Sequence, residues 1–352
     1  MLSYIFRKSL YGIVVLFLVV LTISSIIYLS PVDPAALTQG QRTDTQTIEA
    51  VQKEYGLDQP LHVQLGKYLR DISPVDILSN NKITKEKYSF IPLIPVGGES
   101  YFSLKKPFLR TSYQTGERVS VLLGKAIPQT IVLAFAAIFL GCIIGIFLGV
   151  MAALRKNSWL DSTAIVTSVM GYSLPSYVSA ILLALIFGYY LQAWTGLNVQ
   201  GSLFGIDDFG DEKIFWKNLI LPALALGIRP IGIITQLTRS SMLDVLSQDY
   251  IRTAKAKGLS KTKVIFKHGL RNALNPVVTA VSGWFAALLA GAFFVENVFS
   301  YNGLGKITVD ALLTRDIPVV LGAILFTAFL FVIINLLVDI LYTFLDPRVK
   351  LT

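Results

Sequence analysis

Six long apolar runs are the dominant pattern of this 352-residue chain. A membrane-spanning helix needs about 20 consecutive, mainly apolar residues. The runs cover approximately residues 9–29, 130–154, 162–190, 219–237, 277–295 and 319–345. This pattern predicts an all-α polytopic membrane protein with about six transmembrane helices. Pro175 lies inside the third run, and Pro222 and Pro230 break the fourth, where proline marks a bend.

The polar segments between these runs divide the chain unevenly. We expect an N-terminal transmembrane helix, a long loop region, a main transmembrane domain and a short tail, over residues 1–30, 31–116, 117–345 and 346–352. Within the loop region, residues 45–55 and 61–72 have helix-like sequence. The first run follows Arg7 and Lys8, as a signal peptide would, but it is too long for one and no cleavage site follows it. The first helix is therefore predicted to stay uncleaved, with its N-terminus in the cytoplasm.

Charged residues are scarce and unevenly placed. They make up 15% of the chain, against about 25% in soluble domains, and the net charge is +9. With the N-terminus inside, the cytoplasmic segments hold 14 Lys and Arg and four Asp, so the outer segments are near neutral. Such an excess sets the orientation of a membrane protein. It predicts a multi-pass protein of the cell inner (plasma) membrane with both termini in the cytoplasm, and a nucleic-acid partner is not expected.

Few residues are available for metal or disulfide chemistry. Two His and one Cys fall short of a four-ligand zinc site, and a single Cys forms no intrachain disulfide. Cys142 lies in an apolar run and is expected to pack there. Gly141, Gly145 and Gly149 recur every four residues, a stripe that lets a second helix approach closely. That second helix belongs either to this chain or to a partner subunit.

The basic segment 239–276 carries the most distinctive local pattern. Ile251, Ala254 and Gly258 share one helix face, and Gly258 suits the position just past a helix end, where a left-handed conformation is needed. We expect two short helices joined near Gly258 to form an elbow on the cytoplasmic side. From residue physics the elbow either lies on anionic lipid or docks a soluble partner.

Ionisable residues inside the bilayer cost free energy, so their presence suggests a function. Arg229 lies in the fourth run, Glu296 ends the fifth and Asp339 lies in the sixth. Each is a candidate for lining a translocation path and meeting a substrate's charges. The alternative is that Glu296 reaches the interface and that Asp339 pairs structurally or caps a bend.

Nine short phrases spread over nearly the whole chain resemble one known family. They are LDQPL, IPQT, YSLPS, RSSMLDVL, VENVFS, GLG, DIP, NLLVD and DPR, at residues 57–61, 127–130, 172–176, 239–246, 295–300, 303–305, 316–318, 335–339 and 346–348. In order and spacing they resemble the first permease subunit of ATP-binding-cassette (ABC) importers of the dipeptide, oligopeptide and nickel group. The chain departs from that family in three places. Arg252, Thr253 and Ala254 replace an acidic-alanine core, the first outer loop is longer, and residues 109–113 replace a glycine-aspartate-glycine phrase.

The resemblance implies a type I ABC importer permease fold with a long extracytoplasmic loop after the first helix. Segment 239–276 would be the coupling loop that transmits ATPase movement to the spans. The residues expected to form the ATPase contact are Tyr250, Arg252, Ala254, Ala256, Gly258 and Leu259. The implied partners are a second, similar permease subunit, two cytoplasmic ATP-binding subunits and an extracytoplasmic substrate-binding protein, with lipid around the spans.

No enzyme activity is expected of this chain. The segment most similar to a phosphate-binding loop is residues 303–307. It lacks the leading glycine of that motif and has Ile at the position where Ser or Thr binds magnesium. ATP and Mg²⁺ are therefore expected on the partner ATPases, and this chain is expected to hold no cofactor, metal or catalytic residue. The resemblance favours di- or oligopeptides as substrates, with nickel or another small solute as the alternative within the family.

Other function classes fit less well. A secondary transporter would need a charge relay or an inverted repeat. An intramembrane enzyme would need a catalytic pair or a zinc motif at membrane depth. A structural scaffold would leave the elbow unexplained.

Overall fold

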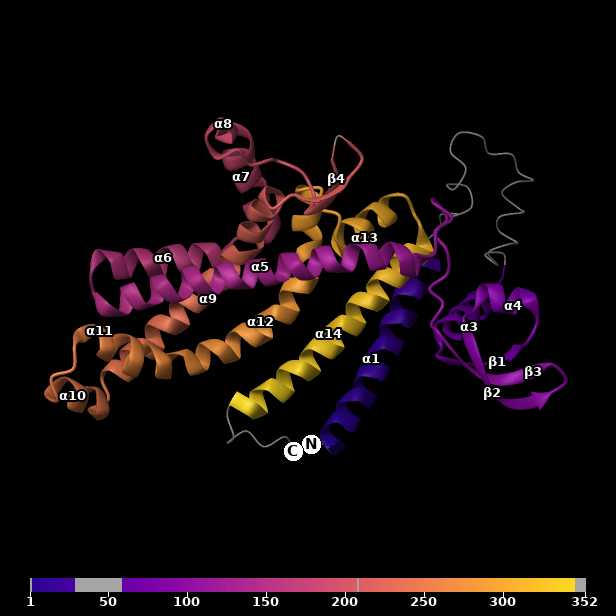
Figure 1. Cartoon of the computed structure of the whole chain (residues 1–352), viewed down its shortest axis with the longest axis horizontal. Helices are drawn as coiled ribbons and strands as arrows, with labels where there is room; N and C mark the ends of the chain where they lie inside the picture. Colours follow the sequence, from indigo (N-terminus) through magenta and orange to yellow (C-terminus); the bar gives the residue numbers. More distant parts are fainter. Residues whose placement is uncertain (1, 29–58, 208, 346–352) are drawn as a thin grey trace. The chain divides into compact units, whose positions relative to one another are not determined.

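The computed structural model of the chain is mainly helical and describes residues 2–28, 59–207 and 209–345 (Figure 1). Its described residues fall into two compact units. We call residues 1–9, 126–306 and 330–352 the core unit, and residues 10–125 and 307–329 the loop unit. Each unit is considered by itself.

The core unit is built from long helices with short connections. Its elements include most of α5 (Val119–Leu154), α6 (Trp159–Ser173), α7 (Ser176–Leu183), the π-helical segment η2 (Ala184–Tyr190), α8 (Gln192–Thr195), the strands β4 (Phe204–Ile206) and β5 (Glu212–Ile214), α9 (Lys217–Leu246), α10 (Asp249–Ala256), α11 (Lys261–Lys263), the π-helical segment η3 (Val264–Leu270) and α12 (Arg271–Val298). Helices α5, α7, α9 and α12 share one apolar core, and Cys142 packs against it as the sequence predicted.

The loop unit combines parts of three long helices with a small sheet. Its elements are α1 (Leu2–Tyr28, from residue 10), α3 (Leu61–Ile72), β1 (Val75–Ser79), α4 (Lys82–Lys87), β2 (Phe90–Gly97), β3 (Ser100–Lys105), the first turns of α5, most of α13 (Leu304–Leu313) and the first part of α14 (Ile317–Leu345). Helix α3 confirms the helix predicted over 61–72, whereas the predicted helix over 45–55 lies outside the described residues.

Four described helices are long and apolar enough to cross a membrane. They are Tyr4–Ile26, Val119–Leu154, Lys217–Leu246 and Ile317–Ile340, and one bent helix pair provides a further candidate. The sequence-predicted span at 277–295 coincides with α12, some of whose side chains lie outside the described part. The multi-pass helical architecture expected from the apolar runs is therefore present.

The third apolar run forms two helices instead of one continuous span. Helix α6 and the α7–η2 pair meet at an angle of 106°. Leu174, between them, is extended, with ψ of 130°. A residue that precedes proline is pushed out of the helical region by the proline ring, so Pro175 ends α6 and begins a new helix.

The two prolines of the fourth run do not break it. Helix α9 continues through Pro222 and Pro230, both of which are buried. Neighbouring helices stabilise such an interior proline by packing around it. The expected break at these prolines is therefore replaced by a single 30-residue helix.

The glycine stripe of α5 lies against α9 of the same chain. A Cβ on Gly145 would stand 2.8 Å from Ile234 Cβ, and one on Gly149 would stand 2.6 Å from Thr238 Cβ. Side chains larger than hydrogen would push the two helices apart. The stripe therefore serves internal packing, which was the first of its two interpretations, and α5 and α9 lie side by side in Figure 1.

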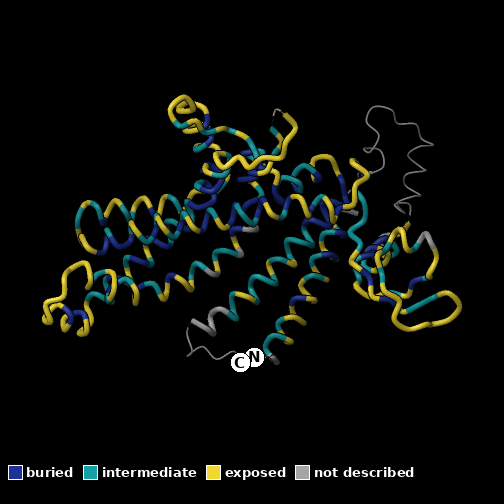
Figure 2. Tube along the Cα trace, in the orientation of Figure 1, coloured by how far each residue is buried: buried dark blue, intermediate teal, exposed yellow. Residues whose placement is uncertain are grey.

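The three-stranded sheet of the loop unit was not predicted from the sequence. Its strands are antiparallel in the order β1–β3–β2. Strand β2 contains Pro92 and Pro95, and the register shifts beside each. Because proline cannot donate to a ladder, it argues against a strand in sequence-based prediction and is tolerated mainly at a sheet edge, which is where β2 lies. Figure 2 shows how exposed this edge is.

Candidate translocation and coupling sites

The segment between α9 and α12 folds into a helical elbow. After α9 ends at Leu246, α10 runs from Asp249 to Ala256, and the chain turns at Gly258. Gly258 has φ of +76°, the left-handed conformation that favours glycine. From Lys261 the helix continues through α11 and the π-helical η3 into α12. Single π-helical turns recur at functional sites because they rotate the following helix face.

The elbow has a small apolar core of its own. Ile251, Ala254 and Val264 are buried together, packed by Val245 and Leu246 from the end of α9. The helix face read from the sequence is therefore real, but it covers the elbow's own chain. The Ala254 side chain accordingly lies inside the elbow and not on an outer contact surface.

The outward side of the elbow carries the other residues expected to form the ATPase contact. Tyr250, Arg252, Ala256, Gly258 and Leu259 are exposed. Figure 2 shows this end of the core unit as one of its most exposed parts. A Cβ at Gly258 would meet nothing within 4 Å, so this turn has open space on its outer side.

Two contacts orient this outward side. The Asn272 side-chain amide donates to the Tyr250 hydroxyl at 3.0 Å and ties α10 to the start of α12. Arg252 Nη1 lies 3.6 Å from Asp249 Oδ1, and both side chains are largely exposed. An exposed ion pair of this kind contributes little stability. The surface is thus held in shape while its charges stay available.

A buried ion pair stands where α6 and α9 approach the elbow. Arg239 donates two hydrogen bonds to Asp161, one of them from Nη2 to Oδ2 at 2.7 Å. The Asn157 backbone N–H donates to the same carboxylate at 2.9 Å. The pairing of these two charges was not predicted from the sequence. The signal that could have found them is local: Ser158 caps α6 with its side chain, and Asp161 stands three residues later, as in a capping box.

Glu296 is fully buried and forms a structural cap. Thr130 Oγ1 donates to it at 2.7 Å, and the backbone N–H groups of Gly305 and Lys306 donate at 2.7 and 3.2 Å. These N–H groups belong to the first turn of α13 and have no partner within the helix. A Cβ on Gly303 would lie 2.4 Å from the carboxylate. The phrase around residues 303–305 is therefore explained by this cap, and Glu296 does not line an open path.

Asp339 is held by residues from the start of α1. Lys8 Nζ lies 2.8 Å from one carboxylate oxygen, and the Tyr4 hydroxyl donates to the same oxygen at 2.9 Å. This matches the structural pairing that was the alternative to a path role. The pair ties the two ends of the core unit's sequence together.

Arg229 is placed differently from the two acids. Its guanidinium carbon lies 5.6 Å from the ring centre of Tyr172 on α6 and 5.9 Å from that of Trp284 on α12. Its Nε is buried and has no hydrogen-bond partner among the residues that the structure describes. An arginine over aromatic faces keeps its charge in a region of low polarity, and this one retains donors for a further group.

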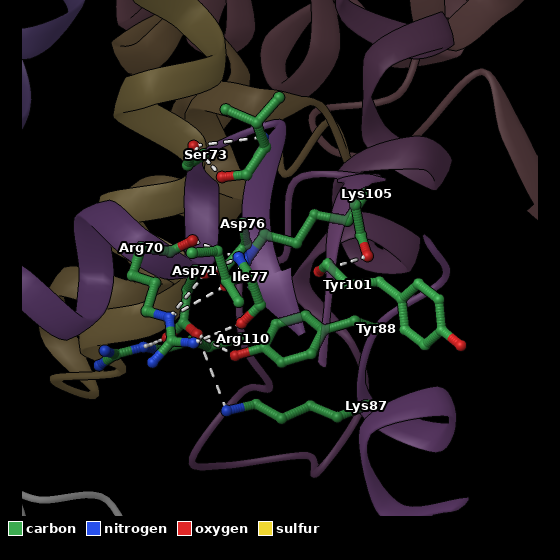
Figure 3. A network of polar contacts seen from close by, with 12 residues as sticks. Arg70, Asp71, Ser73, Asp76, Ile77, Lys87, Tyr88, Tyr101, Lys105 and Arg110 are labelled. Atoms are coloured by element: carbon green, nitrogen blue, oxygen red, sulfur yellow. Dashed lines mark hydrogen bonds and ion pairs between the residues drawn. The ribbon is translucent and has the colours of Figure 1, made fainter. Parts of the chain in front are cut away.

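A polar network in the loop unit was missed entirely by sequence analysis. The fully buried Lys105 side chain donates to the Arg70 carbonyl at 2.7 Å and to Asp76 at 3.0 Å. Arg70 Nε donates to the other oxygen of Asp76 at 2.9 Å, and Figure 3 shows the arrangement. Burial alone would raise the pKa of Asp76, but the hydrogen bonds from Lys105 and Arg70 outweigh it and hold the pKa below its usual range.

Asp71 is the second acid of that network. It accepts from the Tyr88 hydroxyl at 2.5 Å and from Arg110 Nε at 2.9 Å. Burial, and then the hydrogen bond to Asp71, raises the pKa of the Tyr88 hydroxyl. These side chains line a cavity of about 720 Å³. No local sequence pattern links them, because α3, the segment between α4 and β2, and the segment after β3 contribute one residue each.

Spanning helices joined by an exposed helical elbow fit a membrane transport protein. The profile of the family described as binding-protein-dependent transport system inner membrane component matches residues 145–351, and the chain belongs to that family. It is therefore the transmembrane permease of an ABC importer, a transport protein and not an enzyme, which works with partner subunits of the transporter. The profile of that family's N-terminal region matches residues 1–78.

Curated relatives extend over almost the whole chain. A putative peptide transport system permease protein of Brucella abortus is 38% identical over 99% of both chains. The dipeptide transport system permease protein DppB of Alkalihalophilus pseudofirmus is 37% identical over 99% of this chain and 100% of its own. The glutathione transport system permease protein GsiC of Salmonella paratyphi A is 34% identical over 99% of both.

A solved structure shows the same fold. The inward-facing MetNI methionine ABC transporter matches with a TM-score of 0.51 and 18% identity, covering 64% of this chain and 97% of that one. The type I importer permease fold implied by the sequence phrases is thereby confirmed.

Proposed function

We propose that this chain is the permease subunit of an ABC importer for short peptides. The support is the agreement among relatives: those named above carry peptide, dipeptide or glutathione transport in their names, at 34–38% identity over nearly full length. A transporter of varied peptides must recognise the groups that all peptides share, which are the two termini and the backbone.

The observation that carries a permease mechanism is the elbow. A turn with its own apolar core is stiff, because Ile251, Ala254 and Val264 are buried in it, while the residues outside that core are open to a partner. A stiff element of this kind transmits a push on its outer face to α9 and α12. In this proposal two cytoplasmic ATP-binding subunits hold ATP and Mg²⁺ and supply that push.

The remaining partners and the orientation belong to the same proposal. A second, similar permease subunit completes the path, and an extracytoplasmic binding protein delivers the peptide. Both termini and the elbow face the cytoplasm of the inner membrane, in agreement with the excess of Lys and Arg on that side. The segment between the first two predicted spans is then extracytoplasmic.

Reconstituted transport tests this proposal. The chain is co-expressed with the ATPase, second permease and binding-protein genes adjacent to its own, and the complex is placed in proteoliposomes. ATP-dependent uptake of a labelled dipeptide is expected, and this chain alone is expected to show no ATPase activity. Transport of a metal ion or sugar with no uptake of di-, tri- or tetrapeptides would contradict the substrate assignment.

A further inference from the structure

Arg229 is the most deeply placed charge of the long helices. It is the thirteenth of the 30 residues of α9, about 18 Å along the axis at 1.5 Å per residue. Within α1, α5, α9, α12, α14 and the α6–η2 pair, every other Asp, Glu, Lys or Arg lies within about two turns of a helix end. Arg229 therefore sits near the middle of a hydrocarbon layer about 30 Å thick.

The acids that could neutralise Arg229 are already engaged. Asp161 is bound by Arg239, and Asp339 by Lys8. Glu296 accepts from Thr130 and from the start of α13. Among the described residues, none forms an ion pair with Arg229. A charge at membrane depth without a counter-charge is costly and marks a substrate or ion pathway by default.

The surroundings of Arg229 keep its charge and fix its direction. Tyr172 and Trp284 approach it from α6 and α12, at 5.6 and 5.9 Å. Gly171, beside Tyr172, packs against Ile228, the neighbour of Arg229, so α6 and α9 are in close contact here. Aromatic faces stabilise the cation but accept no N–H hydrogen bonds in the ring plane. The guanidinium fork thus keeps donors, including the buried Nε.

Part of this cluster is open. Tyr172 is 45% exposed, and Arg229 and Trp284 are only half-buried. If Arg229, Tyr172 and Trp284 only held α6, α9 and α12 together, we would expect their side chains to be fully buried. The cluster around the guanidinium is thus not sealed by the described residues.

We propose that Arg229 binds the C-terminal carboxylate of the peptide as it crosses the membrane, with Tyr172 and Trp284 as positioning residues. This inference rests on the proposed peptide transport. A planar guanidinium matches a carboxylate with two parallel hydrogen bonds, which a Lys does not reproduce. The carboxylate is common to all unmodified peptides, so a site of this kind discriminates by terminus and leaves the side chains unrestricted.

The test compares a dipeptide with its C-terminal amide in proteoliposomes that contain the complete transporter. Both are offered by the binding protein at saturating load, so that delivery is equal. A charge-assisted hydrogen bond is worth enough for about a ten- to hundredfold preference. The unaltered complex is therefore expected to transport the acid about ten- to a hundredfold faster than the amide. Equal transport of both would overturn the inference while leaving peptide transport intact, and transport of neither would count against the proposed function itself.

Variants separate recognition from structure. Arg229→Gln is expected to reduce acid uptake to about the amide level, so that the acid-to-amide preference is lost. Arg229→Lys keeps the charge and should retain a partial preference. Tyr189→Phe, at an exposed ring outside the cluster, is the control and should behave as the unaltered protein. An equal loss of acid and amide uptake in Arg229→Gln, at normal membrane abundance, would show a structural role and refute the proposal. If Arg229→Gln fails to accumulate, the acid-to-amide ratio of Arg229→Lys decides, since an unchanged ratio there also refutes it.

Discussion

At the scale of single residues, the charged groups discussed in the long helices divide into acids that are bound within the chain and Arg229, which has no ion-pair partner among the described residues. Glu296, Asp161 and Asp339 each have a specific partner in the chain. Breaking such a pair leaves the other group unsatisfied, which costs more than the pair itself contributes. Within the described part of the chain, the contacts of the Arg229 guanidinium are with the aromatic faces of Tyr172 and Trp284. Mutation of one of the acids should therefore lower the stability of the protein, whereas mutation of Arg229 should change the substrate selectivity of transport.

Asp76 in the loop unit offers a test of the first group. Asp76→Asn keeps the side chain's shape but leaves the buried Lys105 ammonium without its counter-charge. We expect the sheet to lose about 1–3 kcal/mol of stability. Hydrogen exchange of residues 75–105 measures this, with the exposed Lys85→Gln as the control. Unchanged exchange in Asp76→Asn would show that the ion pair is not stabilising.

The same pair predicts a pH dependence. Because the pKa of Asp76 is lowered on folding, its contribution is present above the usual pKa, about 4, and is lost as the pH falls through the folded value. Protection of residues 75–105 should therefore decline as the pH falls below about 4. In Asp76→Asn this part of the decline should be absent, and an identical acid profile in both proteins would contradict the assignment.

At the scale of helices and turns, two close approaches determine the arrangement of the core unit. One is the α5–α9 contact at the glycine stripe, and the other is the sharp turn between α6 and α7. The first depends on glycine, because a larger side chain would not fit between α5 and α9. The second depends on Pro175, which keeps the preceding Leu174 out of the helical conformation. The elbow adds a third element, stiffened by Ile251, Ala254 and Val264.

The glycine stripe makes a specific prediction about packing. In Gly149→Ala the new Cβ would lie 2.6 Å from Thr238 Cβ and 2.7 Å from the Thr235 carbonyl oxygen. Overpacking of this kind costs about 1–3 kcal/mol. Thermal unfolding of the purified protein in detergent should show the loss. Gly124→Ala, on the same helix with nothing within 4 Å, is the matched control and should be neutral or slightly stabilising.

The elbow predicts a separation of insertion from transport. Gly258→Asn tolerates the left-handed turn but projects a side chain into the open outer space, whereas Gly258→Ala strains the turn with little added bulk. If a partner ATPase occupies that space, Gly258→Asn should keep normal membrane abundance and lose peptide uptake and ATPase co-purification, while Gly258→Ala should retain part of both. Normal uptake in Gly258→Asn would show that no partner lies against the turn.

At the scale of the whole molecule, the testable property is orientation. In a Cys142→Ala background, single cysteines at Asn80 and Ser260, both exposed, report on the two sides of the membrane. A membrane-impermeant thiol reagent applied to intact cells should label Asn80→Cys and spare Ser260→Cys until the membrane is opened. The opposite pattern would reverse the topology and remove the elbow from the cytoplasm.

Much of the architecture could be predicted because it depends on local composition. A run of apolar residues long enough to cross a membrane is visible without any knowledge of its neighbours, and so is a basic loop with a helix face ending at Gly258. The sheet around Lys105 was not visible, since its strands are short and β2 carries two prolines. Its buried charges come from segments up to 39 residues apart, from Asp71 to Arg110.

The sequence by itself determined that this is a multi-pass helical protein with a permease elbow, because spans and amphipathic faces are properties of consecutive residues. It could not tell what those faces cover: the pattern of Ile251 and Ala254 specifies a buried face, and only the tertiary structure shows that the elbow's own core buries it. The same holds for the charges at membrane depth. Whether Glu296, Asp339 or Arg229 has a partner depends on residues distant in the chain, which packing alone brings together.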